Sequence, residues 1–216
     1  MSATQSRDVV IPIKSGVLNA TQVDPKQGMG HVIFAHGSGS SRLSPRNQFV
    51  ADVLVDAGFG ALLLDLLTVE EDRIYANRFD IPMLSNRLIE AVKWERDHLC
   101  TTAPIAFFGA STGAAAALIA ASVLGESISA VVSRGGRPDL AGDSLNSVRC
   151  PTLLIVGGLD GQVIDLNREA LARIPASTMK ELLVVPGATH LFEEPGTLEQ
   201  VAGLTRDWFN RFAVSM

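Results

Sequence analysis

Short, almost wholly apolar runs alternate with helical patterns along most of this 216-residue chain. Strands that are buried on both faces read as continuous apolar runs, whereas strands with one solvated face alternate apolar and polar residues. The clearest apolar runs are His31 to Ala35, Gly60 to Leu64, Pro104 to Phe108, Pro151 to Val156 and Glu181 to Val185. The sequence therefore predicts an α/β protein, with a mostly parallel sheet and helices on both faces.

Other patterns complete the expected order of elements. Further strands are predicted over Val9 to Ile13, Val17 to Val23 and Ile128 to Val132, the first two as an antiparallel pair. Helices are predicted from Ser44-Pro45 to Gly58, from about Leu84 to about Leu99, after Gly113, around Val163 to Arg173, and along Leu198 to Phe209. A polar stretch, with no predicted element, follows the strand that ends at Leu64 and runs to Asp80. The length suits a single domain over residues 1–216.

The charge balance restricts the class of partner. The formal net charge is −5 and the pI is about 5.3, with no block of lysine or arginine residues. This composition argues against nucleic acid or an anionic membrane surface as the main partner. A small neutral or anionic molecule is the expected partner, and a homo-oligomer is left open.

The N-terminus and the cysteines bear on the compartment. The first eight residues lack the basic-then-apolar order of a signal peptide, and Cys100 and Cys150 are too few for a disulfide framework. A cytoplasmic location is therefore expected. The uncharged run from Cys100 to Gly125 has the length of a membrane helix, but Pro104 and two glycines divide it into a strand and a separate helix.

A sharp turn is predicted at Gly109-Ala110-Ser111-Thr112-Gly113, between an apolar strand and an alanine-rich helix. A glycine two positions before the serine and another two positions after it let the strand and the helix pass closely. The serine hydroxyl would lie at a helix N-terminus, where the dipole and free N–H groups favour negative charge. The pattern is typical of a nucleophilic serine, although ordinary tight turns also carry it.

Two further polar residues follow predicted strands. Asp160 lies in Gly157-Gly158-Leu159-Asp160-Gly161, and His190 ends Gly187-Ala188-Thr189-His190. Functional groups of parallel sheets collect beyond the carboxyl ends of the strands, and the chain order Ser111, Asp160, His190 is that of a Ser-Asp-His triad. Taken singly, Asp160 reads equally well as a turn residue or helix N-cap, and His190 as a hydrogen-bonded loop histidine.

The glycine- and serine-rich segment from His36 to Ser41 supplies a candidate oxyanion hole. One backbone donor would be the N–H of Thr112 and the other the N–H of Ser38, with Gly39 as the alternative. His36 is interpreted as a structural histidine that fixes this loop. The segment lacks the spaced Gly-Lys-Ser/Thr of a phosphate-binding loop.

No cofactor is expected. The elbow at Ser111 could open a dinucleotide-binding unit, but no acidic residue stands at the tip of the following strand. His98 and Cys100 lie two positions apart without a second pair of ligands, so a metal site is not predicted.

The segments HGSGSSR, FGASTG, GGLDGQV and GATHLF together resemble the α/β-hydrolase superfamily, from about His31 to the final helix. The short segment between Arg134 and Cys150 is similar to the dienelactone hydrolase-like branch and implies that there is no large cap domain. Dienelactone hydrolases use a cysteine nucleophile, whereas this elbow carries Ser111. The resemblance therefore implies a general serine hydrolase of small carboxylic esters or thioesters. The alternative is a ligand-binding protein that keeps the fold without catalysis.

Arginines near the predicted site are candidates for binding an anionic part of the substrate. Arg134 ends a predicted parallel strand, Arg137 follows it, and Arg42 follows the oxyanion loop. Guanidinium groups there could bind a carboxylate or phosphate, with Arg42 and Arg134 as the named candidates. The competing interpretation is that these arginines form salt bridges with nearby acidic residues, namely Glu70, Glu71, Asp139 or Asp143.

Overall fold

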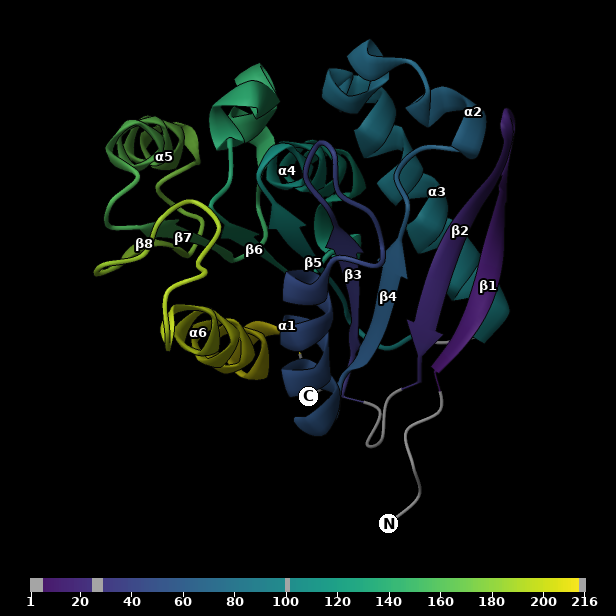
Figure 1. Cartoon of the computed structure of the whole chain (residues 1–216), viewed down its shortest axis with the longest axis horizontal. Helices are drawn as coiled ribbons and strands as arrows, with labels where there is room; N and C mark the ends of the chain where they lie inside the picture. The colour runs from purple at the N-terminus through teal and green to yellow at the C-terminus, as the bar shows by residue number, and fades with distance from the viewer. Residues whose placement is uncertain (1–5, 25–28, 100–101, 214–216) are drawn as a thin grey trace.

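The computed structural model describes residues 6–24, 29–99 and 102–213 (Figure 1). Within them, one eight-stranded sheet has the order β1-β2-β4-β3-β5-β6-β7-β8. The strands are β1 (Ser6–Ile13), β2 (Gly16–Val23), β3 (His31–Ala35), β4 (Gly60–Leu64), β5 (Ile105–Ala110), β6 (Ala130–Arg134), β7 (Thr152–Gly157) and β8 (Lys180–Val185). The pairs β1–β2 and β2–β4 are antiparallel, and all other neighbouring strands are parallel. The predicted fold class is confirmed.

Helices cover both faces of the sheet (Figure 1). One face carries α1 (Pro45–Asp56) and α6 (Thr197–Phe212), which pack on each other. The opposite face carries α3 (Ile81–Leu99), α4 (Thr112–Leu124) and α5 (Gly161–Arg173). Each of these helices therefore buries an apolar face against the strands.

The central strands contribute to two cores at once, because successive side chains of a strand point to opposite faces. Phe107 belongs to the core under α3 and α4, while Phe34 and Phe108 belong to the core under α1 and α6. The Phe34 and Phe108 rings pack with centroids 5.0 Å apart. Each buried phenylalanine contributes about 1.5–3 kcal/mol to folding. The continuous apolar runs of the sequence reflect this double burial.

Most predicted elements are present with bounds shifted by one to three residues, and the largest difference lies before Asp80. The stretch before Asp80 contains a short helix, α2 (Val69–Asp72), and a 3-10 helix, η1 (Tyr75–Phe79). The Thr68 hydroxyl accepts from the Glu71 N–H while the Glu71 carboxylate accepts from the Thr68 N–H, and this capping box starts α2. No residue of α2 is buried, so periodicity could not reveal it. Strand β6 begins at Ala130, two residues later than predicted, because the 3-10 turn η2 (Gly125–Ser127) precedes it.

The connection between β6 and β7 is the 3-10 segment η3 (Pro138–Ser147), which packs on α4 and α5. This segment is no separate cap domain, as predicted, so nothing comparable to a lid is inserted after β6. The carboxyl ends of β5, β6, β7 and β8 lie along the same edge of the sheet (Figure 1).

None of the described helices is both long and apolar enough to cross a membrane. As predicted, the uncharged run before Gly125 contains two separate elements, the strand β5 and the helix α4. Cys150 is a buried free thiol, and burial raises its pKa to about 11. Cys100 lies outside the described residues.

Candidate active site

Ser111 occupies a strained turn between β5 and α4. Its backbone has φ 50° and ψ −120°, in the left-handed range that residues with a Cβ rarely adopt. The surroundings hold it there: its N–H donates to the Arg134 carbonyl at 3.3 Å, and its carbonyl accepts from the Arg137 N–H at 3.0 Å. The strand–turn–helix geometry predicted for the elbow is confirmed.

Glycines around this turn are required by close backbone contacts. A Cβ on Gly109 would lie 2.5 Å from the Ala114 Cα, and one on Gly113 would lie 2.3 Å from the Ala35 carbonyl oxygen. Both distances are far shorter than real Cβ contacts, so the two glycines allow β5, α4 and β3 to pass. The prediction that Gly109 and Gly113 let the strand and the helix pass closely is therefore confirmed.

Asp160 and His190 meet at the ends of neighbouring strands. Asp160 follows β7 and His190 follows β8, and the His190 Nδ1 lies 2.7 Å from the Asp160 Oδ2. The Asp160 side chain makes no capping hydrogen bond to α5, although Asp160 stands at the N-cap position. Its carboxylate is thus directed to the imidazole and not to the N-terminus of α5.

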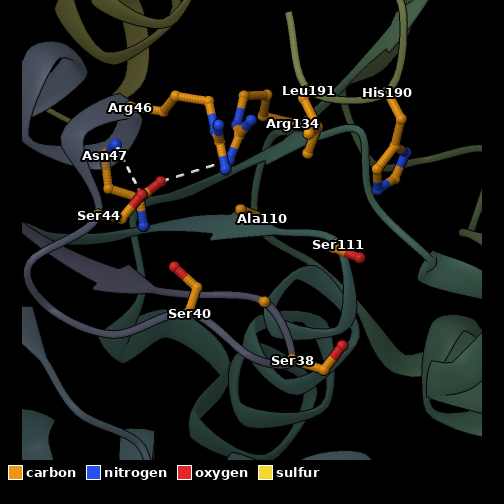
Figure 2. Close-up of a pocket in the computed structure, with 11 residues that line it drawn as sticks. Ser38, Ser40, Ser44, Arg46, Asn47, Ala110, Ser111, Arg134, His190 and Leu191 are labelled. Carbon is orange, nitrogen blue, oxygen red and sulfur yellow. Dashed lines mark hydrogen bonds between the residues drawn. The ribbon is translucent and has the colours of Figure 1, made fainter.

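One pocket contains both Ser111 and His190. Its volume is about 230 Å³. Its lining also includes Gly37, Ser38, Ser40, Ser44, Arg46, Asn47, Ala110, Arg134 and Leu191. Figure 2 shows Ser111 and His190 on one side of this pocket, with Arg46 and Arg134 away from them. No group of three or more potential metal ligands gathers anywhere in the described part of the chain.

The loop after β3 is fixed by His36. The His36 Nδ1 lies 2.9 Å from the Gly37 carbonyl, and its Nε2 accepts from the Leu66 N–H at 3.1 Å. These two contacts require a neutral ring protonated at Nδ1, and burial lowers the pKa of His36 accordingly. The structural role predicted for His36 is confirmed.

The predicted oxyanion donors lie together, but one of them is occupied. Thr112 is the first residue of α4, a position whose N–H has no acceptor within the helix. The Ser38 N–H donates to the Thr112 Oγ1 at 2.9 Å. The loop after β3 and the N-terminus of α4 are therefore joined by a hydrogen bond, and the Ser38 amide already has a partner.

The candidate arginines behave differently from one another. Arg134 is buried and lines the pocket. Arg42 does not line it: the Arg42 guanidinium pairs with Asp65 at 3.1 Å, so the expectation that it faces the substrate is wrong. Arg137 pairs with Asp139 at 2.8 Å, as the salt-bridge interpretation predicted.

Sequence reasoning missed Arg46, which lines the pocket together with Ser44 and Asn47. These residues form the N-terminus of α1, where the Ser44 hydroxyl accepts from the Asn47 N–H. A cation in the first turn of a helix is unfavourable next to the positive end of the dipole. That unusual position, directly after Ser44-Pro45, was the available clue.

Comparisons with known proteins agree with this geometry. The family model described as the alpha/beta hydrolase fold matches residues 30–215. Curated proteins from two strains of Mycobacterium tuberculosis, provisionally named phosphoribosyl transferase, are 61% identical over 186 residues. That match covers 86% of this chain but only 42% of those proteins, so the chain spans less than half of their length.

Solved structures give the same result. The crystal structure of dienelactone hydrolase from Anabaena variabilis is similar with a TM-score of 0.93 and 47% identity, over 98% of this chain and 100% of that one. Est1E from Butyrivibrio proteoclasticus shares the fold, with a TM-score of 0.80 and 16% identity over 94% and 98% of the two chains. An esterase from Pyrococcus furiosus does so with a TM-score of 0.79 and 20% identity over 98% and 92%. The chain therefore belongs to the α/β-hydrolase fold family, in its dienelactone hydrolase-like branch.

Proposed function

We propose that this protein is a serine hydrolase that cleaves small carboxylic esters or thioesters through an acyl-enzyme intermediate. The observation that carries the proposal is one pocket holding Ser111 on its strained elbow and His190 bonded to Asp160. Hydrolases and esterases among the structural neighbours support the reaction class.

The proposed mechanism assigns a role to each of Ser111, Asp160 and His190. Asp160 accepts the Nδ1–H of His190, which leaves Nε2 as the general base. His190 takes the Ser111 hydroxyl proton as Oγ attacks the carbonyl carbon. It then returns that proton to the leaving oxygen or sulfur as the bond to the acyl group breaks. A water molecule, deprotonated by His190, releases the acid and restores Ser111.

The oxyanion of the tetrahedral intermediate would be held by backbone amides. The Thr112 N–H is directed outward from the N-terminus of α4, where the dipole adds stabilisation. The Ser38 N–H is the second donor that we propose, and it would exchange the Thr112 hydroxyl for the substrate oxygen. Gly39 remains the alternative second donor.

The size of the pocket points to small substrates. A volume of about 230 Å³ accommodates a short acyl or alcohol group, and there is no cap domain to enclose a larger one. The mycobacterial relatives carry a transferase name, but this chain covers 42% of them. We infer that the matching part of such proteins is a hydrolase and that a transferase activity would reside in the remainder.

Chemical labelling tests the proposal. The protein is expected to hydrolyse p-nitrophenyl acetate and to lose this activity after treatment with a fluorophosphonate. Mass spectrometry is expected to find the added phosphonyl group on the peptide that contains Ser111. Ser111→Ala is the control: its circular dichroism stays that of the wild type, and its turnover falls by at least about a thousandfold.

Two results would contradict the proposal. A Ser111→Ala protein with activity within tenfold of the wild type would show that another group is the nucleophile. A folded wild-type protein that turns over none of the esters or thioesters, and resists the phosphonate, would favour the non-catalytic binding protein instead.

A further inference from the structure

Arg134 is a buried cation without a counter-ion among the described residues. Its exposed fraction is 7%, and no described carboxylate lies within ion-pair distance of it. Its Nη2 donates to the neutral Asn47 Oδ1 at 3.4 Å, its Nε has no partner, and its guanidinium lies 5.9 Å from the centre of the Phe192 ring. Burying an uncompensated charge is costly, so a structural arginine would normally be paired.

A second cation shares the same pocket. Arg46 reaches it from the first turn of α1, and Figure 2 shows the Arg46 and Arg134 side chains converging above Ser44 and Asn47. Burial, and secondarily the charge of Arg46, lower the pKa of Arg134 to about 10. Arg134 therefore remains charged at neutral pH and is repelled by the guanidinium group of Arg46.

Arg46, unlike Arg134, has an acidic partner among the described residues, Glu193. The Arg46 Nη1 lies 2.9 Å from the Glu193 Oε1, and the Glu193 side chain is 62% exposed. Glu193 follows His190 by three positions on the same loop. It can leave Arg46 for solvent at small cost, because an exposed ion pair contributes only about 0–1 kcal/mol.

We propose that Arg134 and Arg46 form an anion subsite that selects acidic esters, with Glu193 as a competing internal anion. The ligand is an ester whose acyl part carries an oxyanionic group, held by the two guanidinium groups while its carbonyl faces Ser111. The N-terminus of α1 adds a favourable dipole to this end of the pocket. The reaction itself rests on the proposed hydrolase function.

Charge balance predicts which anion binds better. Arg134 and Arg46 together with Glu193 leave one positive charge, which matches a carboxylate. When Glu193 is removed or turned away, two positive charges remain, and these match a doubly charged phosphonate. The wild type is therefore expected to prefer a carboxylate ester, and loss of Glu193 is expected to favour the phosphonate ester more than the carboxylate ester.

Three esters with one leaving group test this selectivity. The p-nitrophenyl esters of valeric acid, glutaric acid and 4-phosphonobutyric acid have similar length but carry a neutral end, a carboxylate and a phosphonate. The measured quantity is kcat/KM, corrected for hydrolysis without enzyme. The ratio of the charged ester to the valerate reports the subsite, whereas the valerate alone reports the hydrolase activity.

Variants assign the effect to residues. Arg134→Gln is expected to lower the glutarate-to-valerate ratio about 10- to 100-fold, and Arg46→Gln about three- to tenfold, because its guanidinium is more exposed. Glu193→Gln is expected to raise the phosphonate-to-valerate ratio several-fold. Arg168→Gln, which removes an exposed guanidinium paired with Asp165, is the matched control and leaves every ratio unchanged.

A binding measurement keeps the inference testable without turnover. Glutarate is expected to raise the Tm of Ser111→Ala, and adding Arg134→Gln to that variant is expected to abolish the rise. Equal losses on charged and neutral esters, or a glutarate-induced Tm rise that survives the loss of Arg134, would overturn the anion subsite while the valerate activity still supported the hydrolase. Lack of valerate activity with an intact, Arg134-dependent Tm rise would overturn the hydrolase and leave the subsite standing.

Discussion

At one end of the pocket, the imidazole of His190 contacts the carboxylate of Asp160; at the other, the guanidinium of Arg134 contacts only neutral groups and lies near a second arginine. At the first end, the imidazole of His190 has its acidic partner, Asp160, within the chain. The second end has a positive charge that the described residues do not balance. The difference teaches that the same pocket holds one polar side chain with an acidic partner from the chain and one buried cation without such a partner among the described residues.

Asp160→Asn is the most severe test of the end of the pocket where Asp160 contacts His190. The amide would bond His190 in the wrong tautomer and would not stabilise an imidazolium, so kcat is expected to fall about 10³- to 10⁴-fold. Ester hydrolysis by the purified variant gives this number. Asp165→Asn, which alters an exposed carboxylate paired with Arg168, is the control and is expected to keep wild-type activity. A loss below tenfold in Asp160→Asn would mean that another group orients His190.

Gly113→Ala tests whether close backbone packing stabilises the turn that carries Ser111. The added Cβ would lie 2.3 Å from the Ala35 carbonyl oxygen, and the free energy of unfolding is expected to fall by about 3 kcal/mol. Urea denaturation followed by circular dichroism measures it. Gly161→Ala is the control, since its Cβ would meet nothing within 4 Å and its φ is not in the positive range. Equal stability of the two variants would show that the elbow tolerates side chains.

Thr112→Val tests the link between the two backbone donors. Removing the hydroxyl deprives the Ser38 N–H of its acceptor and releases the loop, so kcat is expected to fall by a factor of about 2 to 10. Thr112→Ser keeps the hydroxyl and should restore the rate. An unchanged or higher kcat in Thr112→Val would mean that the hydroxyl only obstructs Ser38. Steady-state kinetics on one neutral ester distinguish these results.

Arg42→Gln gives the smallest expected effect and sharpens the contrast between the arginines. Its guanidinium pairs with Asp65 outside the pocket, so kcat/KM for charged and neutral esters should stay within about twofold of the wild type. Loss of this partly exposed ion pair is expected to cost about 1 kcal/mol or less, by thermal unfolding. A selective loss on acidic esters would return Arg42 to the anion subsite.

Local sequence patterns were sufficient to predict much of the fold and the turn that carries Ser111. The apolar runs located the central strands because both faces of the sheet are covered, and Ser44-Pro45 marked the start of α1. The glycine spacing around Ser111 located a turn whose strain is held by neighbours within a few residues and by β6. The short helix α2 escaped because it buries no side chain, and periodicity reports only burial.

The sequence by itself determined the order and type of the central elements, and it placed Ser111, Asp160 and His190 each directly after a strand. It could not distinguish Arg42 from Arg134, because both follow strands and both carry the same charge. Only the tertiary structure decided that Asp65 neutralises Arg42, that Arg46 enters the pocket, and that Arg134 is buried without an acidic partner. The physical reason is range: strand burial and turn strain are encoded in neighbouring residues, whereas charge pairing depends on side chains brought together across the sheet from distant parts of the chain.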